Sequence, residues 1–214
     1  MEHGNTPFAQ DVLQRGLRQR PGSPKLLLEA GLASALAGKV EDAKHSILAA
    51  HEADPRSSPP LLALGVIQLQ SGDAASAAEY FRKAKELAPN DARSYYLRAL
   101  ALSRSRSSHE PAVRAEVVAE LHRALKLNPQ QPNAFVLLGE VELASGRADL
   151  ASAEFKRALR IDPAEPTALY QYALLCRRQG NTAEAQRLFR AFQQTKKKSE
   201  DQESQLVLVL RMLK

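Results

Sequence analysis

The side chains that could perform chemistry are few and scattered. His45 and His51 are six residues apart, which places them on different faces of a helix. Glu140 and Glu142 are two residues apart and diverge in the same way, so one helix cannot supply the paired carboxylates of general acid–base catalysis. The remaining histidines are isolated, at His3, His109 and His122. These residues therefore predict surface or capping roles, with no catalytic or metal site.

The cysteine and glycine content points the same way. Cys176 is the single cysteine, which excludes an internal disulfide and any CxxC metal or redox site. We expect it to be a small buried apolar residue. The glycines are spaced as helix ends and form no phosphate-binding loop. The sequence therefore predicts no cofactor and no enzyme activity in this chain.

The composition favours a helical protein with a packed core. Of the 214 residues, 44% are hydrophobic and 25% are charged, which is too apolar for a disordered chain. Aromatic residues make up only 5% and Trp is absent, so the core must be built from small and straight-chain aliphatic side chains that favour helix. The net charge of +6 permits an acidic partner, although spread over a surface it mainly promotes solubility.

Prolines and glycines recur at a nearly constant spacing. Successive members of one series are separated by 34, 34, 40 and 34 residues: Pro21, Pro55, Pro89, Pro129 and Pro163. A second series falls midway between them: Gly38, Gly72, Gly146 and Gly180. Each repeat is therefore predicted to contain two helices of roughly 13 residues, one ended by glycine and the other by proline.

Residue size keeps the same register. Small residues mark close helix contacts in the first helices, at Gly31, Gly65, Ala99, Gly139 and Ala173. Large residues fill complementary positions in both helices: Leu27, Leu61, Tyr95, Phe135 and Leu169, then Ile47, Phe81, Leu121, Phe155 and Phe189.

At these positions the chain resembles the tetratricopeptide repeat family, whose pattern is W-x2-L-G-x2-Y, then A-x3-F, then P. The fourth repeat has Phe135-x2-Leu138-Gly139, then Ala151-x3-Phe155 and Pro163. The chain departs from the pattern at its second aromatic position, the Tyr, where the five repeats have Ser34, Gln68, Leu102, Glu142 and Cys176. The resemblance implies an all-α fold, a right-handed α-solenoid (superhelix) of stacked antiparallel helix pairs.

The repeat register sets the expected boundaries. Residues 1–23 form an N-terminal half-repeat, and residues 24–57, 58–91, 92–131, 132–165 and 166–195 form five repeats. The third carries a six-residue insertion between its helices, in the loop SRSRSSHEP. The half-repeat either is capped by residues 1–7 or marks a chain cut from a longer array, and the second interpretation is slightly favoured.

Residues 196–214 form a polar segment followed by the apolar stretch LVLVLRMLK. A capping helix packed on the last repeat is the favoured interpretation, ahead of insertion into a groove and of membrane-surface binding helped by Lys196, Lys197 and Lys198. No signal peptide and no apolar run long enough to span a membrane are present. The cytoplasm is the default compartment, but in a fragment the compartment is undecided.

Resemblance to the family implies that a protein segment docks on a concave surface lined by the first helices. The predicted partner-binding residues are Leu28, Leu32, Leu62, Val66, Arg93, Tyr96, Leu100, Asn133, Val136, Glu140, Tyr170, Leu174, Arg177 and Arg178. For Leu28, Leu62 and Val136, packing between neighbouring first helices is an equal alternative. Some family members bind acidic chaperone tails through Lys and Asn at these positions, but leucine and valine fill them in the first two repeats.

The predicted function is a non-catalytic scaffold or adaptor that binds a peptide or helix with apolar anchors and some acidic residues. The alternative is a self-associating scaffold that uses the half-repeat or the C-terminal apolar stretch to form a homo-oligomer. A nucleic-acid-binding helical repeat is a minor alternative, because no basic residue recurs at a fixed repeat position.

Overall fold

A computed structural model describes residues 6–199, and within that range it contains eleven α-helices and no strand. The described chain divides into two compact units, which we call unit 1 (residues 6–101) and unit 2 (residues 102–199). The predicted all-α class is confirmed. The predicted C-terminal apolar helix lies outside the described residues.

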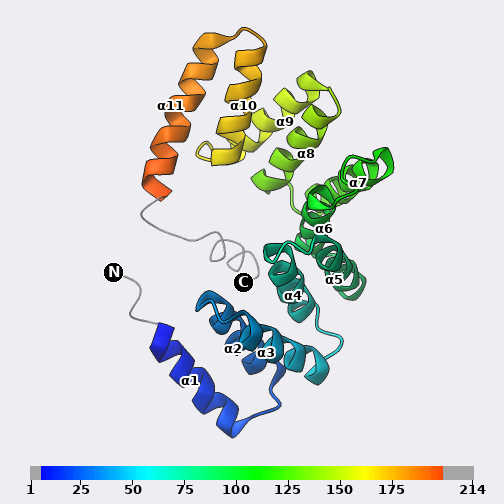
Figure 1. Ribbon diagram of the computed structural model, residues 1–214, viewed down its shortest axis with the longest axis vertical. Coiled ribbons are helices and arrows are strands. Elements are labelled where there is room, and N and C mark those ends of the chain that lie inside the picture. Colours follow the sequence, from blue (N-terminus) through cyan, green and yellow to red (C-terminus); the bar gives the residue numbers. More distant parts are fainter. Residues whose placement is uncertain (1–5, 200–214) are drawn as a thin grey trace. The chain divides into compact units, whose positions relative to one another are not determined.

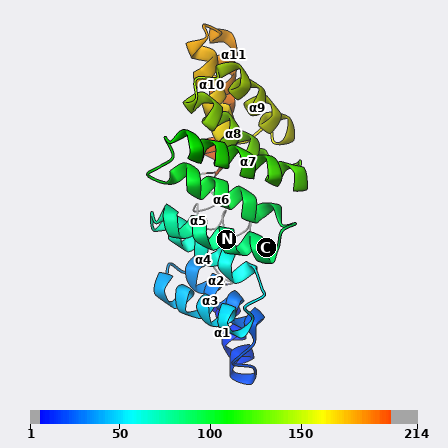
Figure 2. The same ribbon diagram turned by 90° about the vertical axis from the view of Figure 1, so that its right-hand side faces the viewer.

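Unit 1 is a stack of helix pairs. Its helices are α1 (Thr6–Gln19), α2 (Pro24–Leu36), α3 (Val40–Ala53), α4 (Pro59–Gln70), α5 (Ala74–Leu87) and most of α6 (Ala92–Arg104). α2 pairs with α3 and α4 pairs with α5, while α1 packs on α2 (Figures 1 and 2). The first helices α2 and α4 also contact each other, as expected when each pair must cover the apolar side of the next.

Unit 2 repeats this arrangement. Its helices are α7 (Pro111–Leu127), α8 (Pro132–Ala144), α9 (Ala148–Ile161), α10 (Pro166–Arg178) and α11 (Thr182–Ser199). α8 pairs with α9, and α10 lies between α9 and α11 (Figure 1). The first helices α8 and α10 contact each other as α2 and α4 do in unit 1.

Glycine ends the first helices because it adopts a backbone conformation that other residues avoid. Gly146 follows α8 with φ of +75°, and the backbone N–H of Arg147 then donates to the carbonyl oxygen of Glu142 at 2.9 Å. The other three predicted glycine stops also have positive φ: Gly38, Gly72 and Gly180. Each proline of the predicted series stands two residues after the end of a second helix or of α1.

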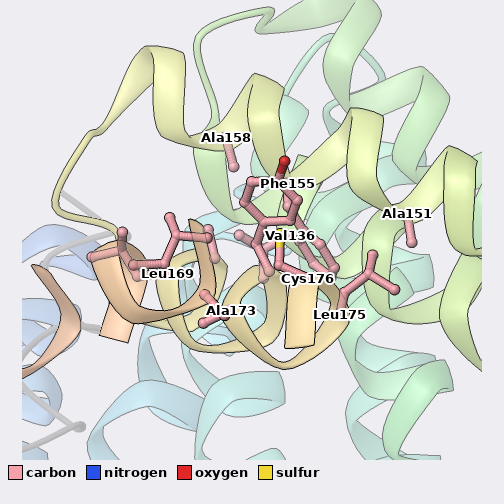
Figure 3. Close-up of a cluster of buried hydrophobic side chains, with 12 residues drawn as sticks. Val136, Ala151, Phe155, Ala158, Leu169, Ala173, Leu175 and Cys176 are labelled. Atoms are coloured by element: carbon pink, nitrogen blue, oxygen red, sulfur yellow. The ribbon is translucent and has the colours of Figure 1, made fainter. Parts of the chain in front are cut away.

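The core is built where small residues let the helices of a pair approach. A methyl group at Gly139 would lie 2.5 Å from Cε1 of Phe155, and the same distance separates such a group at Gly65 from Cε1 of Phe81. Phe155 is fully buried with Leu169 and Cys176 in the unit 2 core (Figure 3). Burial also raises the pKa of the Cys176 thiol, which agrees with the predicted apolar role.

The insertion in the third repeat is divided between loop and helix. Residues 105–110 connect α6 to α7, whereas residues 71–73 make the corresponding connection between α4 and α5. α7 has 17 residues where α5 has 14, because Pro111 begins the helix earlier than its counterpart does. Half of the six extra residues thus extend the helix, and the loop is shorter than the sequence predicts.

Candidate partner-binding faces

The predicted partner-binding residues lie on the first helices of both units. In unit 1 they are Leu28 and Leu32 on α2, Leu62 and Val66 on α4, and Arg93, Tyr96 and Leu100 on α6. We call this set the unit 1 face. In unit 2 they are Asn133, Val136 and Glu140 on α8 and Tyr170, Leu174, Arg177 and Arg178 on α10. We call this set the unit 2 face.

The unit 1 face is largely buried. Leu62 and Val66 are 0% exposed, and Leu32 and Tyr96 are also buried. α4 is apolar around its whole circumference, as expected for a helix covered on every side. Leu28 packs against the core cluster that contains Leu32, so the packing alternative fits the placement of Leu28 and Leu62.

Two residues of the unit 1 face on α6 are only partly buried. The guanidinium of Arg93 is held by the carboxylate of Asp91, with Nη2 2.9 Å from Oδ2. The same carboxylate accepts a hydrogen bond from the backbone N–H of Arg93 and so fixes the start of α6. Leu100 is half-buried.

The unit 2 face is more open. Tyr170 is 41% exposed, and Arg177 and Arg178 are exposed at the end of α10. Asn133, Glu140 and Leu174 are half-buried. Val136 is the exception, because it is buried in the unit 2 core, where the packing alternative fits it (Figure 3).

Tyr170 belongs to an aromatic cluster that joins α10 to α11. Its ring centroid lies 6.0 Å from that of Phe189, in an edge-on arrangement, and 5.3 Å from that of Phe192. The guanidinium of Arg177 lies 5.8 Å from the Phe189 ring centroid, within cation–π range. Sequence analysis gave Phe189 only a packing role and gave Phe192 none, although their three-residue spacing indicates a shared helix face.

Two carboxylates near this face are partly desolvated. Burial raises the pKa of the Glu140 carboxyl, which Arg104 lowers in part and the nearby Glu165 raises further. Burial likewise raises the pKa of Glu165, whose carboxylate caps α10 by accepting a hydrogen bond from the Thr167 backbone N–H at 3.1 Å. Sequence analysis missed Glu165, although its position just before Pro166 is a helix-capping signal.

No group of three or more His, Cys, Asp and Glu side chains that could hold a metal ion occurs among the described residues. Glu142, which diverges from Glu140, pairs with Arg147. No helix within residues 6–199 is long and apolar enough to cross a membrane.

The fold resembles solved structures of low sequence identity. One is a structure of PilF from Pseudomonas aeruginosa, with 24% identity and a TM-score of 0.71, in which the match covers 83% of this chain and 78% of that one. Another is YrrB, described as a tetratricopeptide repeat protein with an unusual peptide-binding site, with 16% identity, a TM-score of 0.63, and coverage of 87% and 93%. At these identities the likeness concerns the fold.

Sequence relatives agree with the fold. Cellulose synthase 1 operon protein C of Komagataeibacter xylinus is 26% identical over 187 residues, which is 83% of this chain but 14% of that protein's length. The sequence model of the tetratricopeptide repeat matches residues 37–92, 118–166 and 146–200, together more than half of the chain. With its glycine-ended and proline-ended helix pairs, this chain belongs to the tetratricopeptide repeat family.

Proposed function

We propose that this chain is a non-catalytic scaffold that holds a peptide or helical segment of a protein partner on the unit 2 face. Proteins of this family generally mediate protein–protein interaction, and their fold is typically non-catalytic. The observation that carries the proposal is the exposure of Tyr170, 41%, at a repeat position where unit 1 has the fully buried Leu62. An exposed aromatic side chain that the core does not need is a strong candidate for an interface anchor.

The surroundings of Tyr170 suit that role. Phe189 and Phe192 hold the ring from one side, so little side-chain entropy remains to be lost when a partner binds. Leu174 lies one helical turn further along α10 and extends the apolar strip. Tyr and Arg are enriched among residues that dominate binding energy, and Arg177 adds a cation beside the cluster.

The partner chemistry follows from the charges around this strip. An apolar side chain would pack on Tyr170 and Leu174, and an acidic residue would pair with Arg177 or Arg178. A basic residue of the partner near α8 would pair with Glu140 or Glu165. Burial raises the pKa of both carboxyls, and a nearby cation would stabilise their charged forms. YrrB, which is described as having a peptide-binding site, supports peptide binding by this type of fold.

The proposal is tested by quantitative capture of partners on the immobilised full chain, followed by titration calorimetry with the purified partner. Tyr170→Ala should weaken binding about tenfold or more, as expected for a central anchor. Leu150→Ala is the matched control, because Leu150 is 51% exposed in the same unit but lies on the second helix α9. Equal binding by both variants would show that Tyr170 is no anchor and would overturn the proposal.

Self-association through α1 is the second candidate. Val12 on α1 is 50% exposed, which leaves an apolar side chain of the half-repeat in solvent. Light scattering of the full chain and of Val12→Glu separates the two functions. A dimer that the substitution dissociates would support self-association, and a monomer in both would exclude this route.

A further inference from the structure

A cleft opens between the second helices α9 and α11 of unit 2, away from the residues of the unit 2 face. It has a volume of about 540 Å³ and is lined by Ala153, Lys156, Arg157, Leu159, Arg160, Tyr172, Glu184 and Arg187. Tyr172, which belongs to α10 between the two helices, is 7% exposed and forms the apolar base together with the half-buried Leu159.

The rim of the cleft is strongly basic. Four cationic side chains line it against one carboxylate, that of Glu184. Arg187 is paired with Glu184 at 2.6 Å, and Arg157 is paired with Glu154 at 2.8 Å. These two pairs leave Lys156 and Arg160 as the cations of the lining without a salt bridge, although Lys156 still acts at longer range on Glu184, whose pKa it helps to lower.

The two remaining cations are exposed and available. Lys156 lies with Nζ 5.6 Å from the Tyr172 ring centroid, so the ring orients the ammonium without neutralising it. Arg160 forms no salt bridge with any described residue. Both side chains are exposed, one turn apart on α9.

The repeat itself does not require this basic set. The equivalent positions in unit 1, set by the register that aligns Phe155 with Ile47 and Ala185 with Ala77, carry other residues. Lys156 corresponds to Leu48, Arg160 to Glu52 and Arg187 to Glu79. At these three positions α3 and α5 are apolar and acidic, so the repeat does not fix a basic residue there.

We propose that the cleft between α9 and α11 binds an acidic peptide segment of a protein partner. Lys156 and Arg160 would pair with two of its carboxylates, and the apolar base would take an intervening side chain. A peptide fits better than single-stranded nucleic acid, because the one aromatic ring in the lining, Tyr172, is buried beneath Lys156, where no nucleobase can stack. This site is separate from the unit 2 face of the proposed function.

Binding of fluorescein-labelled hexaglutamate to the full chain, measured by fluorescence anisotropy at about 0.15 M salt, tests the proposal. Lys156→Glu/Arg160→Glu should weaken binding about tenfold or more, and the neutral pair Lys156→Gln/Arg160→Gln should weaken it by a smaller factor. The matched control is Arg56→Glu/Lys83→Glu, which makes the same charge change at exposed positions of unit 1. It should alter the affinity less than twofold or so at about 0.15 M salt, where distant charges are screened.

Two outcomes would overturn the proposal. One is an equal loss of affinity in the α9 variant and in the unit 1 control, which would mean that only net charge matters. The other is tighter binding of a single-stranded thymidine dodecamer than of hexaglutamate, which would mark the cleft as a nucleic-acid site. Tyr170→Ala should leave hexaglutamate binding unchanged, so failure here and failure of the proposed function are distinguishable.

Discussion

The face formed by α3 and α5 in unit 1 and the face formed by α9 and α11 in unit 2 have the same repeat register but differ in charge at three positions. Leu48, Glu52 and Glu79 occupy the positions of Lys156, Arg160 and Arg187. Beneath both faces the packing follows one rule, with Ile47 against Gly31 in unit 1 and Phe155 against Gly139 in unit 2. The comparison teaches that the repeat constrains the positions between helices and leaves the outward positions open to different partners.

The first helices differ in a second way. Leu62 in unit 1 and Tyr170 in unit 2 occupy the same repeat position, yet the first is 0% exposed and the second is 41% exposed. Val136, at the same position in unit 2, is also buried, so one repeat position can serve the core in one repeat and a surface in another.

The largest expected effect tests whether the two cores are equivalent. Phe81→Ala and Phe155→Ala should each lower the free energy of unfolding by about 3–5 kcal/mol, because both rings are 0% exposed and their removal leaves cavities. Urea denaturation followed by circular dichroism measures both, with Leu150→Ala as a control expected within about 0.5 kcal/mol of the unchanged chain. A much smaller loss of unfolding free energy for Phe81→Ala than for Phe155→Ala would show that the two cores are not equivalent.

The second-largest expected effect is a difference in the loss of stability between substitutions at Leu62 and at Tyr170. Leu62→Ala should destabilise the fold by about 2–5 kcal/mol, as for other buried leucines. Tyr170→Ala should cost only about 1 kcal/mol, because it removes contacts with two aromatic rings at a surface. Thermal melts of both variants decide the matter, and a large loss at Tyr170 would assign it to the core instead of the unit 2 face.

Introducing the cations of α9 at the equivalent positions of α3 tests the comparison of charge. Leu48→Lys/Glu52→Arg places the two key cations of the α9 cleft at the equivalent positions of α3 in unit 1. The variant should gain a second hexaglutamate site that is weaker than the first, because Glu79 remains where α11 has Arg187 and repels the carboxylates of the peptide. Titration calorimetry reports the stoichiometry, and Leu48→Gln is the neutral control. An unchanged stoichiometry would show that charge at these positions is insufficient.

The smallest effect concerns pH. Burial raises the pKa of Glu140 above 4.5 in the folded state, so the folded chain binds more protons than the unfolded chain as the pH rises through this window, and stability falls. Glu140→Gln removes this loss. The variant should therefore melt slightly higher than the unchanged chain at about pH 7, with the advantage disappearing near pH 4. An advantage that grows as the pH falls would contradict the raised pKa.

Much of the fold could be predicted from the sequence, because the signals that end helices are local. Gly146 and its three equivalents end α2, α4, α8 and α10 through a positive φ that glycine tolerates, and a proline follows α3, α5, α7 and α9 within two residues. The division of the six-residue insertion was not predictable in this way. The start of α7 at Pro111 depends on whether a proline acts as a breaker or as a first helical residue, and both are consistent with its chemistry.

The candidate site was predicted less completely. The repeat register proposed Tyr170, Leu174, Arg177 and Arg178, and it also proposed Leu62 and Val66, which are buried. For Leu62, packing was an equal alternative. Glu165, Phe192 and the whole cleft between α9 and α11 escaped sequence analysis, because their significance arises only when side chains from different helices meet.

By itself the sequence determined where most of the helices end, which residues repeat, and that the chain is built of helix pairs. Those features depend on backbone conformation and on residue size at fixed spacing, both of which act over a few turns of helix. Only the tertiary structure decided which of the equivalent side chains face solvent and where charges gather. Exposure and electrostatics depend on neighbours contributed by helices distant in the chain, such as α9 and α11 on either side of α10.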